Sequence, residues 1–222
     1  MGSQRTISKY NLEYFHEDLV AGDYDMPTIY PTVYEPKQLI GFNYLNTAQS
    51  DAGIHFYLDD YQFERFWKKP KLYIEKLQRF DCVLSPDFSL YRDMPLAMMM
   101  WNLYRSRLLG QMMQQAGITV IPTVSWAGQR SFDFCFDGLS QYSTLSISTI
   151  GVKRNKVATS IWQIGVKEML KRLHPRQLLI YGGKIEFGYP TNVDVVYYDN
   201  DNVKRLRKVA ANGEQRSVIR DS

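Results

Sequence analysis

The stretch GIHFYLDDYQFERFWKKPKLYIEKL (residues 53–77) shows most clearly which kind of fold this sequence adopts. It opens with a short apolar run, GIHFYL (53–58), which has the length and composition of a buried strand. Apolar residues then recur at helical spacing. Pro70 divides that segment, because a proline inside a helix removes a hydrogen bond and clashes with the preceding turn. The stretch therefore predicts a strand followed by two short helical pieces.

The same alternation of strand and helix continues along the chain. Further strands are expected at 38–45, 82–85, 118–124, 143–149, 177–183 and 193–199, and longer helices at 95–116 and 155–173. Repeated strand–helix units imply parallel strands joined by right-handed crossovers. Because the expected strands are apolar on both faces, helices should cover both sides of the sheet. We therefore predict an α/β fold, either a mostly parallel open sheet or a partial barrel, with helices on both faces.

We expect one domain with an extension at each end. Residues 1–200 would form the single α/β domain, in which 9–21 is predicted to be helical and the proline-containing segment 22–36 to lie as an arm over the core. Residues 201–222 would form a basic C-terminal tail.

The composition is that of a soluble globular protein. Of the 222 residues, 45% are hydrophobic and 23% charged. No stretch approaches the length of apolar sequence that crosses a membrane, and the first residues lack the apolar core of a signal peptide. The two cysteines, Cys82 and Cys135, lie in apolar runs, as buried reduced thiols do. We expect a cytoplasmic protein that makes no membrane contact.

Ligands of parallel α/β folds bind beyond the carboxyl ends of the strands. This rule selects the polar and aromatic residues that follow the expected strands: Asp59, Asp60, Asp87, Ser125, Trp126, Ser148, Thr149 and Tyr181. Asp133, in the loop FDFCFDG (132–138), is expected to join them.

The aspartates admit two interpretations. Asp59 could cap the following helix in a capping box with Gln62. Alternatively, Asp59, Asp60 and Asp87 could be catalytic carboxylates, with Asp59 and Asp87 holding Mg²⁺ or Mn²⁺ for attack on a phosphodiester. Capping explains Asp87 poorly, because Asp93 is closer to the next helix and is the better cap.

The aromatic stretch VSWAGQRSFDFCFDG (124–138) also has two interpretations. Trp126 leaves a strand end and could stack on a base or a sugar. The alternation in FDFCF (132–136) favours a short strand that places Asp133 and Cys135 on the face opposite the phenylalanines.

Common catalytic motifs are absent from the sequence. YGGKIEFG (181–188) matches neither a P-loop nor a dinucleotide-binding fingerprint. No CxxC, HExxH or GxSxG motif occurs, which argues against the common zinc and serine-hydrolase chemistries.

Two further features point to partners. Lys204, Arg205, Arg207 and Lys208 in the tail could contact phosphates of DNA or RNA. Six methionines lie in or beside the helix expected at 95–116. Methionines usually fill a core, but such a group could also bind a protein partner.

Several patches together resemble a known family: DDYQFERFW (59–67), FDCVLSPDFSLYRDMPLAM (80–98), VIPTVSWA (120–127), SFDFCFDG (131–138) and STIGV (148–152). The family is bacterial and phage-borne and is numbered 4417 in the domain-of-unknown-function series. The resemblance covers about residues 10–185. It implies a setting in phages, prophages or conjugative elements and carries over no catalytic residue.

Three functional hypotheses follow. The first is a nucleic-acid-associated protein of a mobile element that acts on phosphodiesters through a metal ion at the carboxylate rim. The alternative is a non-catalytic binding or interaction module on the same fold. A third is a small-molecule enzyme that recognises its substrate through Ser125, Ser148 and Tyr181.

Overall fold

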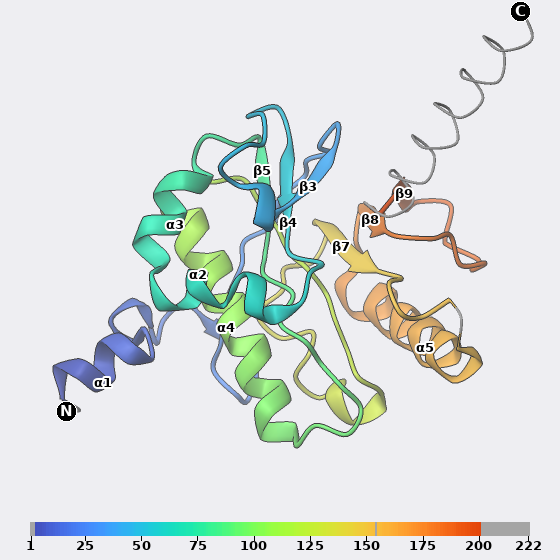
Figure 1. Cartoon of the computed structure of the whole chain (residues 1–222). Helices are drawn as coiled ribbons and strands as arrows, with labels where there is room; N and C mark the ends of the chain where they lie inside the picture. Colours follow the sequence, from blue (N-terminus) through green and yellow to red (C-terminus); the bar gives the residue numbers. More distant parts are fainter. Residues whose placement is uncertain (1–2, 154, 201–222) are drawn as a thin grey trace, which may run out of the picture.

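The computed structural model describes residues 3–153 and 155–200 (Figure 1). The predicted basic tail, with Lys204, Arg205, Arg207 and Lys208, lies outside the described residues. In chain order, the elements are α1 (Gln4–Lys9), η1 (Leu12–Tyr14), β1 (Val20–Ala21), β2 (Met26–Pro27), β3 (Leu39–Gly41), η2 (Phe42–Tyr44), β4 (Gly53–His55), η3 (Asp60–Gln62), α2 (Glu64–Lys68), α3 (Pro70–Leu77), β5 (Cys82–Leu84), α4 (Leu96–Gln115), β6 (Val120–Ile121), η4 (Gln129–Ser131), β7 (Thr144–Ser148), α5 (Lys156–Leu173), β8 (Gln177–Tyr181) and β9 (Asp194–Tyr198).

The core of the fold is a run of parallel strands that neighbour one another in chain order. β3, β4, β5 and β6 form one parallel sheet, and β7, β8 and β9 form a second. Just beyond β6, a parallel bridge pairs Thr123 with Ser146 of β7. There the Ser146 N–H donates to the carbonyl of Pro122 at 2.9 Å, and the Val124 N–H donates to the carbonyl of Ser146 at 2.8 Å. The predicted α/β class, with parallel strands in strand–helix units, is confirmed.

The helices α2 to α5 pack against one face of this strand array. Ile54, Val83 and Val120 share a buried cluster with residues of α2, α3 and α4, and Leu145 and Ile180 share another with α5. Figure 1 shows α5 beside β7 and β8, and α2 to α4 beside the first sheet.

The opposite face of the strands packs against itself. Leu39, Leu84, Ile121, Leu179 and Tyr198 belong to one cluster, although they come from β3, β5, β6, β8 and β9. The array is therefore curved, as in the partial barrel that was one of our two alternatives. The expectation of helices on both faces is wrong. Parallel strands in sequential order with right-handed crossovers place the helices on one side, and the inner face is apolar because it closes on itself.

Local signals placed the main helices correctly. Pro70 is the first residue of α3 and separates it from α2. The Asn155 side chain caps α5 by accepting from the N–H groups of Val157 and Ala158, at 3.0 and 3.1 Å. The helix ends at His174 in the left-handed conformation. These are the positions at which proline and a capping side chain favour a helix boundary.

Two local predictions are wrong. The segment 9–21 is not one helix, because Asn11 adopts a left-handed φ of 56° and its side-chain amide donates to the carbonyl of Trp67 at 2.9 Å. The segment FDFCF (132–136) is a turn rather than a strand. Both Phe134 and Cys135 donate their N–H groups back to the carbonyl of Ser131.

The arm that precedes β3 is ordered, as predicted. The Thr144 N–H, at the start of β7, donates to the carbonyl of Thr32 at 2.6 Å, and the Tyr34 N–H donates to the Thr144 hydroxyl at 3.2 Å. The Tyr198 hydroxyl of β9 donates to the carbonyl of Pro36 at 2.6 Å. The arm is thus fastened to the amino end of β7 and to Tyr198, the last residue of β9.

Candidate active-site cleft

A cleft of about 690 Å³ opens at the carboxyl ends of the strands. Much of its lining comes from the ends of successive strands: Tyr57, Leu58 and Asp59 after β4; Asp87 and Ser89 after β5; Val124, Ser125, Trp126 and Ala127 after β6; Ile147 and Ser148 at the end of β7; and Tyr181 at the end of β8. This is where parallel barrels bind their ligands. The structure therefore brings together six predicted residues: Asp59, Asp87, Ser125, Trp126, Ser148 and Tyr181.

Asp87 is the carboxyl group with the most unusual environment in the cleft. It is half-buried, and its pKa is raised to about 7, chiefly by burial and next by the negative charge of Asp60. A hydrogen bond with Ser125 and the positive charge of Arg107 act in the opposite direction. Asp87 can therefore exchange a proton near neutral pH, which an ordinary carboxylate cannot do.

A buried cation lies behind Asp87. Arg107 of α4 is 1% exposed and donates to three backbone carbonyls, those of Thr123, Cys135 and Asp137, at 3.2, 3.0 and 3.2 Å. Burial lowers its pKa to about 10. It ties α4 to the chain after β6. Its role was not predicted from the sequence, although an arginine in the middle of an apolar helix was a usable signal.

Tyr57 is a second residue of the cleft that was not predicted from the sequence. Its hydroxyl is 2.7 Å from the Ser146 hydroxyl, and its ring stacks on Tyr181 with the centroids 5.1 Å apart. Burial and the neighbouring Asp87 raise its pKa well above the usual value, so the phenol stays protonated. Tyr57 follows β4, and Ser146 lies on β7, so this contact joins two distant strands across the inner face.

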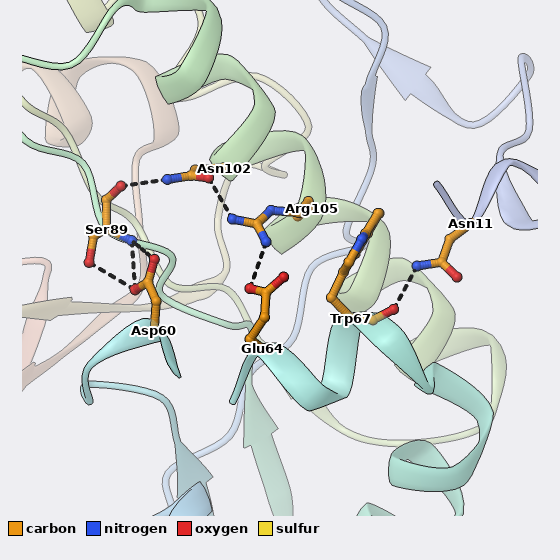
Figure 2. A network of polar contacts seen from close by, with 7 residues as sticks. All are labelled: Asn11, Asp60, Glu64, Trp67, Ser89, Asn102 and Arg105. Carbon is orange, nitrogen blue, oxygen red and sulfur yellow. Dashed lines mark hydrogen bonds and ion pairs between the residues drawn. The ribbon is translucent and has the colours of Figure 1, made fainter. Parts of the chain in front are cut away.

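Asp60 is not among the residues that line the cleft. Figure 2 shows the polar contacts that it makes instead. Its carboxylate accepts from the Ser89 N–H at 3.1 Å and from the Ser89 hydroxyl at 2.8 Å. The Ser89 carbonyl accepts from Asn102 at 2.7 Å, Asn102 accepts from Arg105 at 2.6 Å, and Arg105 pairs with Glu64 at 2.9 Å. We call this chain of contacts the Asp60 clamp. It ties the segment after β5, which carries Asp87, to η3 and α4.

The predicted helix caps are corrected by the structure. Asp59 is exposed and precedes η3, but within the described residues its side chain makes no capping hydrogen bond to that helix, so the capping box with Gln62 is wrong. The N-cap of α4 is Pro95, so the expectation that Asp93 caps this helix is also wrong.

Other predicted residues lie apart from the cleft or in packing positions. Asp133 is exposed, and Thr149 is buried with its hydroxyl donating to the carbonyl of Gly183 at 2.7 Å. In α4, Met99, Met112 and Met113 are core residues, so the described structure gives little support to a methionine-rich partner surface.

The described residues do not build a metal site of the usual kind. Among residues 3–153 and 155–200, no group of three or more His, Cys, Asp or Glu side chains could hold a metal ion. Mg²⁺ or Mn²⁺ at Asp59 and Asp87 stays a prediction.

Comparisons with known proteins place the chain in a family. The model of the Domain of unknown function (DUF4417) matches residues 19–199. The chain belongs to this family. The chain is 43% identical over 163 residues to the Gene 1 protein of Mycobacterium phage D29, and the match covers 72% of this chain and 60% of that protein. It is 40% identical over 163 residues to the Gene 1 protein of Mycobacterium phage L5, covering 72% of this chain and 71% of that protein. No solved structure matches.

The resemblance stated from the sequence patches is thereby confirmed, and the chain is a phage-type domain of this family. It spans 60% of the length of the D29 relative. In the part of the chain that the structure describes, every helix is too short or too polar to span a membrane.

Proposed function

We propose that this DUF4417 domain is an acid–base enzyme that binds a small polar ligand in the cleft and moves a proton through Asp87. One observation carries the proposal: a carboxyl group with a pKa of about 7 lies on the cleft, at the carboxyl ends of parallel strands. A general acid or base is most effective when its pKa lies near the working pH.

The neighbours of Asp87 have roles that fit this chemistry. The hydrogen bond with Ser125 orients the carboxyl group. Tyr57 remains protonated and is fixed by Ser146, so it presents a constant surface to the ligand. Ser148 and Tyr181 line the cleft and would supply polar recognition, as in the small-molecule hypothesis.

A ligand screen tests this proposal. Thermal unfolding of the wild type and of Asp87→Asn would be measured with nucleosides, sugars, amino acids and small organic acids, below and above neutral pH. We expect at least one ligand class to raise the melting temperature of the wild type, with a pH dependence that Asp87→Asn removes. Asp133→Asn, an exposed aspartate outside the cleft, is the matched control. Binding that is identical in Asp87→Asn at every pH would contradict the proposal.

A second candidate is the nucleic-acid hypothesis, either as a metal-dependent phosphodiester enzyme or as a non-catalytic binding module. Its support is that Asp59 and Asp87 both line the cleft and that the relatives are phage proteins. Labelled single- and double-stranded DNA and RNA would be incubated with Mg²⁺, Mn²⁺ or a chelator, then run on native and denaturing gels.

The gels separate the versions of this candidate. Metal-dependent cleavage that is lost in Asp87→Ala supports the enzyme. A salt-sensitive shift without cleavage that disappears when residues 203–222 are deleted supports the binding module. If the gels show no cleavage and no shift, both versions of this candidate are refuted.

A further inference from the structure

One wall of the cleft is a tryptophan that the neighbouring helix holds in place. The Trp126 indole N–H donates to the carbonyl of Ile161 in α5 at 3.3 Å. A Cβ atom at Gly165 would lie 2.1 Å from Trp126 Cε2 and Nε1, so the ring occupies the space above this glycine. α5 therefore supports one side of the indole, while the residue also lines the cleft.

The surface around Trp126 is apolar and rigid. Ala158, Ile161 and Trp162 of α5 line the cleft beside it. The Trp162 indole N–H donates to the carbonyl of Ser148 at 3.0 Å, so this second ring is also fixed. Tyr91 also lines the cleft and is 59% exposed. A flat ring entering the cleft would meet aromatic surfaces that need no rearrangement.

The polar groups lie at the edge of this aromatic wall. Ser125 precedes Trp126 in the chain and is hydrogen-bonded with Asp87. A carboxyl group that exchanges its proton near neutral pH can both donate and accept, and a hydroxyl can do the same. Together these two side chains match a ligand edge on which donors and acceptors alternate.

The charges of the lining argue against a phosphate deep in the cleft. Asp59 and Asp87 are acidic, and Arg92, which is exposed, is the only Lys or Arg of the described chain among the lining residues. An anionic group would be repelled near Asp87 and accommodated near Arg92 at the mouth. The deep part therefore suits an uncharged ring.

We propose that the cleft binds a nucleobase, with its face stacked on Trp126 and its polar edge hydrogen-bonded to Asp87 and Ser125. The inference rests on the proposed function in this same cleft and names its ligand class. Proteins commonly read unpaired bases by combining aromatic stacking with hydrogen bonds to the base edge. A volume of about 690 Å³ suits a ligand of nucleoside size. The base could come from a free nucleoside or from an unpaired position in a single strand.

Calorimetry and tryptophan fluorescence would test the proposal on the full chain. The probes are adenosine, guanosine, cytidine, uridine and thymidine, with ribose as the ring that lacks a base, and single-stranded homopolymers as the second source. We expect at least one base-containing probe to bind and ribose not to bind. Binding of nucleosides identifies a free ligand, and binding of oligonucleotides alone identifies a single strand. Either supports the proposal.

Two variants test the stacking. Trp126→Ala should weaken binding about tenfold or more, as the loss of one base–aromatic stack does. Gly165→Ala should weaken it without changing a cleft residue, because the added methyl group displaces the indole. Trp101 lies on α4 and packs on Tyr104. Trp101→Phe is therefore the matched control and should bind like the wild type. Circular dichroism would show that each variant is folded.

The proposal is overturned if no base-containing probe binds, or if folded Trp126→Ala binds as tightly as the wild type. A ligand without a base that binds in an Asp87-dependent way would overturn this inference and leave the acid–base function standing. A nucleoside that binds equally well to the wild type and to Asp87→Asn at every pH would contradict the acid–base function and leave the nucleobase site standing.

Discussion

Three aspartates that look alike in the sequence have three different environments in the fold. Asp59 is exposed at the cleft, Asp60 accepts hydrogen bonds from Ser89, and Asp87 is half-buried with a raised pKa. The rule that sites lie at strand ends selected all three, and it could not rank them. Their ranking depends on burial, which raises the pKa of Asp87 most, and then on the neighbouring charge of Asp60.

The raised pKa of Asp87 makes a prediction about stability. Its folded value of about 7 lies above the unfolded value of about 3.9, so the folded chain binds more protons between these pH values. The contribution of Asp87 to the free energy of unfolding should therefore fall as the pH rises from about 4 to about 7. A three-unit shift corresponds to at most about 4 kcal/mol, and we expect roughly 1–2 because Asp87 keeps contact with water.

Urea denaturation at a series of pH values would measure this effect. Asp87→Asn should flatten the pH dependence in that window, whereas Asp133→Asn, an exposed control, should leave it unchanged. A wild type whose stability rises through the window, with Asp87→Asn following the same curve, would contradict the assignment.

Arg107 makes a second prediction at the scale of one residue. Arg107→Met removes the donors for three buried carbonyls, so the free energy of unfolding should fall by about 3 kcal/mol or more. Loss of the positive charge should also raise the pKa of Asp87 further, which carboxyl NMR would detect. Arg130→Met, at an exposed position, should cost little. Equal effects of the two substitutions would refute the buried role.

At the scale of elements, long periodic segments could be predicted and short irregular ones could not. The helix α4 follows from its period, and α5 from its period and the capping residue Asn155. The failure at 9–21 comes from a tertiary contact of Asn11 that the local sequence does not contain. At 132–136 the alternation was real, but Cys135 is buried together with the phenylalanines because the chain turns there.

The Asp60 clamp joins η3, α4 and the segment after β5, and it makes a prediction about coupling. A double-mutant cycle with Asp60→Asn and Ser89→Ala should give a coupling energy of about 1–2 kcal/mol, since the hydroxyl hydrogen bond that Ser89→Ala removes has a charged acceptor. The ion pair of Glu168 with Arg172, on one helix, is the comparison and should give about 0.3–0.5 kcal/mol. A coupling no larger than this would mean that the clamp does not hold the segment.

At the scale of the whole molecule, the sequence predicted parallel strands but left the closure of the sheet open. Strands that are apolar on both faces are expected in a sheet that helices cover on both sides. They are equally expected in a curved sheet whose inner face packs on itself. The cluster of Leu39, Leu84 and Tyr198 decides between them. Contacts such as these join strands far apart in the chain, so no local pattern reveals them.

The fastening of the arm gives a prediction at this scale. Tyr198→Phe removes the hydrogen bond to the Pro36 carbonyl and should lower the free energy of unfolding by about 1 kcal/mol. Hydrogen exchange should also accelerate at the Thr144 amide, which donates to the arm. Tyr142→Phe, at an exposed tyrosine, is the control. Unchanged exchange at Thr144 would show that the two fastenings are independent.

The arm also bears on the order in which the chain acquires its structure during synthesis. Each barrel strand pairs with a strand that is near in the chain, so pairing can proceed as the ribosome extends the polypeptide. The arm differs, because Thr32 meets Ser143 across 111 residues and Pro36 meets Tyr198 across 162. The nascent chain must therefore carry the arm undocked while most of the barrel is made. The segment that is synthesised before the strands is the one that docks after them.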